Sequence, residues 1–330
     1  MKSKKVTSNN FLELLAKHTP LLIITHENPD GDAIGAIFGL KTFLNYHSLS
    51  STVLLSESLP SAYNNLINKE DYEYLTNPDE FSKYKGIVVL DSANTSRTIL
   101  KDLATTETSS VIFNIDHHVS NDLFGDFNWV EPKWSSTCEG LVRLLKGEQA
   151  LPKESARLFL MGILTDTGYL AFAAAGLDTL EIVTYLYKNG VSISEIHRSV
   201  KENMNKRQMK LWGYAIYNCQ YEDEYGIIWS SIPNQIYSTL NVKDGDSEGL
   251  VEFFRRYRDC RLALLIREVE PSILRVSLRS KGEVDVNSLA SIWGGGGHPR
   301  AAGFTISGEL NLVLKEILDI IKGKIGICNH

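Results

Sequence analysis

The chain has 330 residues, of which 43% are hydrophobic and 22% charged, and its formal net charge is −6. This length favours two domains of roughly 150 residues each, with the composition of an ordinary globular protein. The acidic balance gives no global reason to coat nucleic acid, which argues against binding of long duplexes.

Cysteine usage and the N-terminal sequence indicate the compartment. The four cysteines lie far apart in the sequence without a CxxC pair, so neither a disulfide framework nor a thiolate zinc site is expected. The first residues are basic, but no apolar run of signal-peptide or membrane-span length follows. We therefore expect a cytoplasmic protein that does not bind membranes.

Apolar runs alternate with helical periodicity in the first half of the chain. Short continuous apolar runs are typical of strands buried on both faces of a parallel sheet. The runs lie at residues 20–25, 86–90 and 110–115, and the helical stretches at 33–46, 136–148, 153–164 and 177–189. This alternation predicts an α/β domain with a mostly parallel sheet over residues 1–190.

The second half of the chain has a different character. Residues 191–212 are polar with helical spacing and are interpreted as a helical linker. Residues 213–330 then predict a smaller α+β domain. Its expected elements are strand pairs at 214–220 with 226–232 and at 260–269 with 273–280, and helices near 247–257 and 309–322.

Each apolar run of the first half ends at polar, ionisable side chains. In open α/β sheets, ligands bind beyond the carboxyl ends of the strands. Imidazole and carboxylate together suit Mn²⁺, Mg²⁺, Fe²⁺ or Zn²⁺. The residues concerned are His26, Asp30, Asp32, Asp91, Asp116, His117, His118 and Asp166.

The number of aspartates favours two metal ions over one. Clustered carboxylates repel one another in a low-dielectric cleft, and two divalent cations would neutralise them. Such a pair would polarise a phosphoryl oxygen and lower the pKa of bound water. We expect one ion at His26, Asp30 and Asp91, and the other at Asp32, Asp91, His117 and Asp166.

Each of these segments also has a structural interpretation. Residues 28–32 have turn chemistry, Asp91 and Asp166 could cap helices, and adjacent histidines are often core residues. Ser136 and Glu139 have the spacing of a capping box, which we favour over a nucleophilic serine. The metal interpretation is preferred because suitable ligands recur at four separate positions.

The same segments resemble the motifs of the DHH phosphoesterase family, in the family's order. The similar segments are residues 26–35, Asp91, Asp116-His117-His118 followed by Asn121, residues 162–168, and, for the DHH-associated C-terminal domain, Gly294 to His298 with residues 301–303. The compact length is most similar to the nanoRNase and phosphoadenosine-phosphate phosphatase branch of the family.

The resemblance implies particular roles. Two Mn²⁺ ions are expected, with Mg²⁺ as the alternative. His118 is expected near the scissile phosphate rather than on a metal, and we assign catalytic roles to His118, Asp116 and Asp91. One departure concerns residues 169–172, Tyr-Leu-Ala-Phe, where relatives often carry an arginine. Its absence leaves the metal ligands intact but affects the expected substrate contacts.

Glycines and cations in the second half predict a substrate site. Successive glycine N–H groups can form an anion-binding nest, and arginine can hold a phosphate with two hydrogen bonds. A flexible loop and a surface ion pair are the structural alternatives. The predicted substrate-binding residues are Arg279, Gly295, Gly296, Gly297, His298 and Arg300.

These features predict a phosphoesterase that cleaves short RNA oligomers and adenosine 3′,5′-bisphosphate. A cyclic or linear di-adenylate phosphodiesterase is the first alternative, and a non-catalytic nucleotide sensor is the second. Exopolyphosphatase or pyrophosphatase activity ranks lower. The sequence leaves open whether the chain forms a homodimer.

Overall fold

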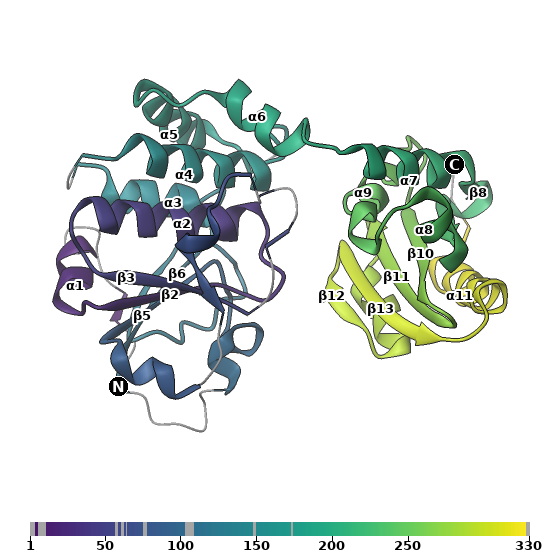
Figure 1. The fold of residues 1–330 in the computed structure, drawn as a ribbon, viewed down its shortest axis with the longest axis horizontal. Helices are drawn as coiled ribbons and strands as arrows, with labels where there is room; N and C mark the ends of the chain where they lie inside the picture. Colours follow the sequence, from purple (N-terminus) through teal and green to yellow (C-terminus); the bar gives the residue numbers. More distant parts are fainter. Residues whose placement is uncertain are drawn as a thin grey trace. The chain divides into compact units, whose positions relative to one another are not determined.

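The computed structural model describes residues 4–5, 11–56, 59–60, 63, 65–74, 78–102, 109–147, 150–172 and 174–327. The chain forms two compact units, Met1–Asn203 and Met204–His330, each built around its own sheet (Figure 1). Their boundary falls inside the predicted linker at residues 191–212. The finer three-part division remains a prediction.

Unit 1 contains a parallel sheet of seven strands in the order β1-β7-β6-β5-β2-β3-β4. The predicted strands β2, β5 and β6 are adjacent at its centre, which confirms the expected α/β architecture. The strands are β1 (Lys4–Lys5), β2 (Leu21–Ile24), β3 (Ser51–Leu55), β4 (Glu73–Tyr74), β5 (Gly86–Leu90), β6 (Val111–Asp116) and β7 (Phe127–Val130).

Both faces of this sheet are covered, which explains why its central strands are apolar throughout. Leu21 and Ile23 face a core shared with α2, α3 and α4, which Figure 1 shows stacked on one side. Leu22 and Ile24 face a second cluster that includes Phe81 and Leu100. The helices are α1 (Phe11–Lys17), α2 (Gly31–Tyr46), α3 (Thr137–Leu145), α4 (Lys153–Asp166), α5 (Leu177–Lys188) and α6 (Ile193–Lys201).

Unit 2 contains a mixed sheet of six strands in the order β12-β13-β11-β10-β9-β8. Helices α7, α8 and α9 pack on one face of it, and α10 and α11 on the other. The strands are β8 (Gln220–Glu222), β9 (Ile227–Ile232), β10 (Leu262–Glu270), β11 (Ile273–Ser280), β12 (Gly296–His298) and β13 (Ala301–Ser307). The helices are α7 (Lys206–Tyr217), α8 (Asn234–Leu240), α9 (Leu250–Phe254), α10 (Val286–Ala290) and α11 (Leu310–Ile325).

The strand expected at residues 214–220 is wrong over most of its length. Residues 206–217 form α7, which begins with a capping box between Asn205 and Gln208. The helix buries Leu211 and Ala215, which lie four positions apart and therefore share one helical face. Only Gln220 of the expected segment pairs with β9. The capping box and the helical spacing of the buried residues therefore favour a helix here, although the aromatic content of the segment is typical of a strand.

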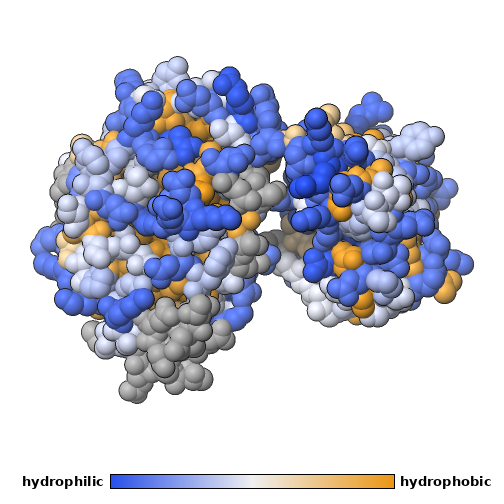
Figure 2. Space-filling model, in the orientation of Figure 1, coloured by the Kyte–Doolittle hydropathy of each residue, from blue (hydrophilic) through white to orange (hydrophobic). Residues whose placement is uncertain are grey.

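The visible surface is mainly hydrophilic over both units, with small apolar areas between the polar ones (Figure 2). Within the described part of the chain, no helix has both the length and the apolar character needed to cross a bilayer.

Candidate metal centre

The predicted ligands of unit 1 meet at the carboxyl edge of the parallel sheet. His26 follows β2, Asp91 follows β5, and Asp116 ends β6, so three neighbouring strands deliver side chains to one place. Asp30 is the N-cap of α2 and accepts hydrogen bonds from two backbone N–H groups. Asp166 is the last residue of α4. The alternative that Asp91 and Asp166 cap helices is wrong, because neither is a helix N-cap. Asp30, by contrast, is both an N-cap and one of the candidate metal ligands.

Ligand-type atoms of these side chains approach one another closely. The Asp91 carboxylate lies between two imidazoles, with Oδ2 3.7 Å from His26 Nε2 and Oδ1 3.6 Å from His117 Nε2. His117 Nε2 is also 3.6 Å from Asp166 Oδ2. In three groups, one ligand-type atom from each residue lies within 4.8 Å of those of the others: His26, Asp30 and Asp91; Asp32, His117 and Asp166; and Asp91, His117 and His118.

Backbone carbonyls orient two of the imidazoles. His26 Nδ1 is 2.8 Å from the Glu27 carbonyl, and His117 Nδ1 is 3.3 Å from the Trp134 carbonyl. A carbonyl only accepts, so Nδ1 must carry the hydrogen in both rings. In the neutral ring, each Nε2 then keeps its lone pair, which is the state that binds a metal.

The carboxylates of the site need a cation for charge balance. Burial raises the pKa of Asp32 well above its usual value, and the negative charges of Asp91, Asp166 and Asp30 raise it further. Burial likewise raises the pKa of Asp166 to about 6, although His117 opposes the shift. A divalent ion would favour the charged forms of both groups. The donor set therefore fits hard or borderline divalent metals.

Asp91 has an unusual backbone conformation and a lowered pKa. Its φ is 58°, in the left-handed region that glycine adopts readily and that, among other residues, mainly asparagine and aspartate visit. Burial alone would raise its pKa, but the neighbouring imidazoles of His26, His117 and His118 lower it to about 2. The carboxylate is therefore held ionised and aimed at the histidines.

Asp116 and His118 form a separate pair beside this centre. His118 Nδ1 lies 2.7 Å from Asp116 Oδ1, and this bond raises the pKa of His118. Asn121 donates to the other oxygen, Asp116 Oδ2, at 2.6 Å. Asp116 is thus occupied in orienting His118, whose side chain keeps about a third of its surface exposed.

The N-terminal end of α3 contributes contacts that the sequence reasoning missed. Thr137 N and Cys138 N donate to Asp32 at 2.6 and 3.0 Å, and Thr137 Oγ1 donates to Asp91 at 2.9 Å. The expected capping box is half correct. Ser136 Oγ accepts from Glu139 N, but the Glu139 carboxylate accepts from Ser135 N rather than from the cap residue. The sequence feature that could have indicated these contacts is the Ser136-Thr137 pair at the start of a predicted helix.

The glycines of unit 2 belong to a β-hairpin. Gly296 and Gly297 pair with Gly303 and Ala302 of β13. A Cβ at Gly295 would lie 2.3 Å from the Gly303 carbonyl oxygen, and one at Gly297 would lie 2.4 Å from another carbonyl oxygen of β13. Close strand packing therefore requires glycine here, and an anion-binding role remains a prediction.

The cationic residues predicted for substrate binding have partners within unit 2. Arg279 pairs with Glu252 of α9 and donates through Nη1 to its neighbour's carbonyl. Among the described residues, its Nη2 group has no hydrogen-bond partner. Arg300 donates to the Val284 carbonyl at 3.3 Å. The backbone of His298 belongs to β12, while its side chain lies outside what the structure describes.

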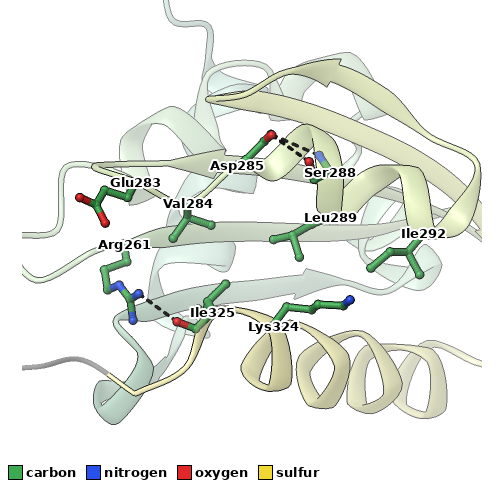
Figure 3. Close-up of a pocket in the computed structure, with 9 residues that line it drawn as sticks. All are labelled: Arg261, Glu283, Val284, Asp285, Ser288, Leu289, Ile292, Lys324 and Ile325. Atoms are coloured by element: carbon green, nitrogen blue, oxygen red, sulfur yellow. Dashed lines mark hydrogen bonds between the residues drawn. The ribbon is translucent and has the colours of Figure 1, made fainter.

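Unit 2 also has a pocket of about 420 Å³ between α10, α11 and the start of β10 (Figure 3). Two of its four charged side chains are engaged in local structure. Asp285 caps α10 by accepting from Ser288, and Arg261 donates to the Ile325 carbonyl at the end of α11. The pocket therefore lacks an assembled set of reactive side chains.

Helices α2, α3 and α4 approach so closely that one position at the site requires glycine. A Cβ at Gly162 would lie 2.3 Å from Cys138 Sγ and 2.9 Å from Asp32 Oδ1. We expect Gly162→Ala to lower the free energy of unfolding by about 1–3 kcal/mol, the usual cost of overpacking. Denaturant unfolding measures this change.

Gly213 provides the matched control, because it lies in α7 and a Cβ there meets nothing within 4 Å. Gly213→Ala should raise stability by up to about 1 kcal/mol through helix propensity. Equal effects of the two substitutions would contradict the close packing at Gly162.

Two family models match this chain. The DHH family N-terminal domain matches residues 20–163, and the DHHA1 domain matches residues 233–325. Together they cover most of the chain and contain the candidate ligands from His26 to His118, with Asp166 just beyond the first match. The fold and the site thus define a metal-dependent phosphoesterase. The chain belongs to the DHH family, in the form that carries a DHHA1 domain.

Relatives extend the similarity over nearly the whole length. A Thermus thermophilus protein named bifunctional oligoribonuclease and PAP phosphatase NrnA is 28% identical over 313 residues, covering 94% of this chain and 91% of the relative. A Bacillus subtilis protein of the same name is 28% identical over 305 residues, covering 89% and 92%.

Solved structures share the fold. An exopolyphosphatase-related protein from Bacteroides fragilis superposes with a TM-score of 0.86 at 24% identity, covering 96% of this chain and 97% of that one. RecJ from Thermus thermophilus, crystallised with Mn²⁺, gives 0.55 at 12% identity and covers 97% and 55%. At these identities the likeness concerns the fold.

Proposed function

We propose that this protein hydrolyses phosphate esters of short nucleotides: it degrades RNA oligomers of a few residues and removes the 3′-phosphate of adenosine 3′,5′-bisphosphate. The observation that carries the proposal is the carboxylate of Asp91 between His26 and His117 at one sheet edge. The names of the full-length relatives support these substrates. The proposal includes a cytoplasmic location and assigns no oligomeric state.

The proposed metal ligands divide into two sets. His26, Asp30 and Asp91 would hold one divalent ion; the other would be held by Asp32, Asp91, His117 and Asp166. When bound, two such ions neutralise carboxylates, activate water and polarise a phosphoryl oxygen. We propose Mn²⁺ as the ion, with Mg²⁺ as the alternative.

The protein's own groups position the substrate and manage protons. His118 keeps a proton on Nδ1 through Asp116, so its Nε2 is the atom available to a phosphate oxygen. Because Asp116 raises its pKa, His118 is more often protonated near neutral pH and can donate a charge-assisted hydrogen bond. In unit 2, Arg279, Arg300, His298 and the glycines at 295, 296 and 297 are proposed substrate contacts.

A turnover panel with Mn²⁺ tests the substrate class. It compares adenosine 3′,5′-bisphosphate, RNA of two to five residues, RNA of about twenty residues, cyclic and linear di-adenylate, and polyphosphate. We expect the bisphosphate and the short RNA to be hydrolysed fastest. Faster turnover of a di-adenylate would support the phosphodiesterase alternative. Binding of nucleotides without any hydrolysis would instead support a sensor.

Arg279 tests the substrate contacts of unit 2. Arg279→Ala should raise KM for adenosine 3′,5′-bisphosphate about tenfold, with a smaller change in kcat, since a charge-assisted hydrogen bond contributes about 1.5–3 kcal/mol. Steady-state kinetics measures both constants.

Glu252→Gln is the matched variant, because it removes the charge of Arg279's partner while leaving the guanidinium in place. If Arg279 contacts substrate, Glu252→Gln should not raise KM. If Arg279 only supports local structure, the two variants should behave alike, and the proposed contact would be wrong.

A further inference from the structure

We infer that Thr137 is a positioning residue of the metal centre: its side-chain hydroxyl fixes the orientation of the carboxylate that both proposed metal sets share. This inference rests on the proposed metal role of Asp91, which it extends to a residue outside the ligand set. It follows from hydrogen bonds made by a single short segment of unit 1.

The segment from Trp134 to Cys138 contacts three of the proposed ligands. The Trp134 carbonyl accepts from His117 Nδ1, the N–H groups of Thr137 and Cys138 donate to Asp32, and Thr137 Oγ1 donates to Asp91 Oδ1. These ligands come from three different elements of the fold. Five consecutive residues therefore set their relative orientation.

The segment is rigid enough for this task. Ser136 and Thr137 are fully buried, and Ser136 Oγ caps α3 by accepting from Glu139 N. The Glu139 carboxylate, 1% exposed, accepts from Ser135 Oγ at 2.6 Å, from Thr179 Oγ1 at 2.8 Å and from the Arg143 side chain. Burial opposes ionisation of Glu139, but these donors lower its pKa.

The hydroxyl of Thr137 has a role that the two backbone donors cannot replace. The N–H groups of Thr137 and Cys138 both donate to the Asp32 carboxylate. The hydrogen bond from this segment to the Asp91 carboxylate is donated by the side-chain hydroxyl, Thr137 Oγ1. A carboxylate turns about its last torsion with little resistance. With Oδ1 fixed by Oγ1, the same oxygen stays 3.6 Å from His117 Nε2 while Oδ2 stays 3.7 Å from His26 Nε2.

Isosteric substitutions isolate this hydroxyl. Thr137→Val removes Oγ1 and keeps the backbone donors to Asp32, whereas Thr137→Ser keeps a hydroxyl. Thr179→Val is the control, because it removes another buried hydroxyl, which bonds Glu139 rather than Asp32 or Asp91. Mn²⁺ affinity is measured by electron paramagnetic resonance titration of the free ion. Thermal melting without metal, and kcat and KM on bis-p-nitrophenyl phosphate, are measured alongside.

We expect Thr137→Val to weaken Mn²⁺ binding about tenfold, the lower end of the range for residues that orient metal ligands. Thr137→Ser should restore affinity to within about threefold. Thr179→Val should change the melting temperature and should weaken Mn²⁺ binding far less than Thr137→Val does, because Glu139 keeps its bonds from Ser135 and Arg143. At saturating Mn²⁺, Thr137→Val should lower kcat more than it changes KM, because the inferred role of the residue is to orient a metal ligand rather than to bind substrate.

The outcomes separate this inference from the proposed function. If the unaltered protein binds no Mn²⁺, the proposed function itself is wrong. If it binds two ions and Thr137→Val binds them equally well, only the positioning role is refuted. Equal losses of affinity in Thr137→Val and Thr179→Val would assign the effect to general packing and would also refute it.

Discussion

Replacing Asp91 by Asn should abolish hydrolysis, with a loss of kcat on the order of 10³ or more. Ligands of a catalytic ion support several kcal/mol of charge stabilisation, and each 1.36 kcal/mol corresponds to a factor of ten. Asp91 is proposed for both metal sets, so its loss affects both. Asn is the right replacement because it has the same shape and tolerates the φ of 58°.

The measurement is turnover of adenosine 3′,5′-bisphosphate at saturating Mn²⁺, with circular dichroism to confirm folding. Asp178→Asn is the matched control, since that carboxylate is on α5 with 83% of its side chain exposed. It should leave kcat unchanged. Activity of Asp91→Asn within tenfold of the parent would rule out a shared ligand at this position.

Removing the metals should have an effect of similar size on activity and a further effect on stability. Dialysis against a chelator should eliminate hydrolysis, and added Mn²⁺ should restore it. The apo site retains carboxylates whose pKa values are raised first by burial and further by the negative charges of neighbouring aspartates, as at Asp32 and Asp166. A metal ion that binds the folded state but not the unfolded state raises the stability of the folded state by mass action. The melting temperature should therefore rise with Mn²⁺.

The pH dependence of this stability has a defined sign. The pKa of Asp166 is about 6 in the folded, metal-free protein against 3.8 as its ordinary value. Between these values the folded state binds more protons than the unfolded state, so its contribution to stability falls as pH rises. The contribution is complete below about pH 4 and is lost as the pH passes 6.

Comparison with Asp166→Asn isolates this contribution, because other groups also shift: the pKa of Asp32 is raised as well, while that of Asp91 is lowered. In the absence of metal, the stability of the parent relative to Asp166→Asn should fall between pH 4 and 6.5. With Mn²⁺ present, the parent should instead gain on the variant as pH rises, because metal ligands must be deprotonated. A metal-free difference that does not vary with pH would contradict the burial of this carboxyl group.

The prediction from sequence was strongest where local chemistry was sufficient. The apolar runs at β2, β5 and β6 identified buried parallel strands, and the polar residues at their ends marked the sheet edge. The prediction was weakest where the local sequence fits both a helix and a strand and tertiary packing decides between them. Residues 214–217 have strand-like aromatic content, but they complete a helix because Leu211 and Ala215 cover the neighbouring sheet.

The sequence by itself determined the type of fold and the donor types of the candidate site, since hydrophobic periodicity and side-chain chemistry are local properties. Tertiary structure alone decided that Asp91 lies between two histidines and that Asp116 turns to His118. It also decided that Thr137 reaches Asp91 and Asp32, which are 46 and 105 positions away. Contacts at such separations depend on how α3 packs against the sheet and α2, and no local pattern encodes that packing.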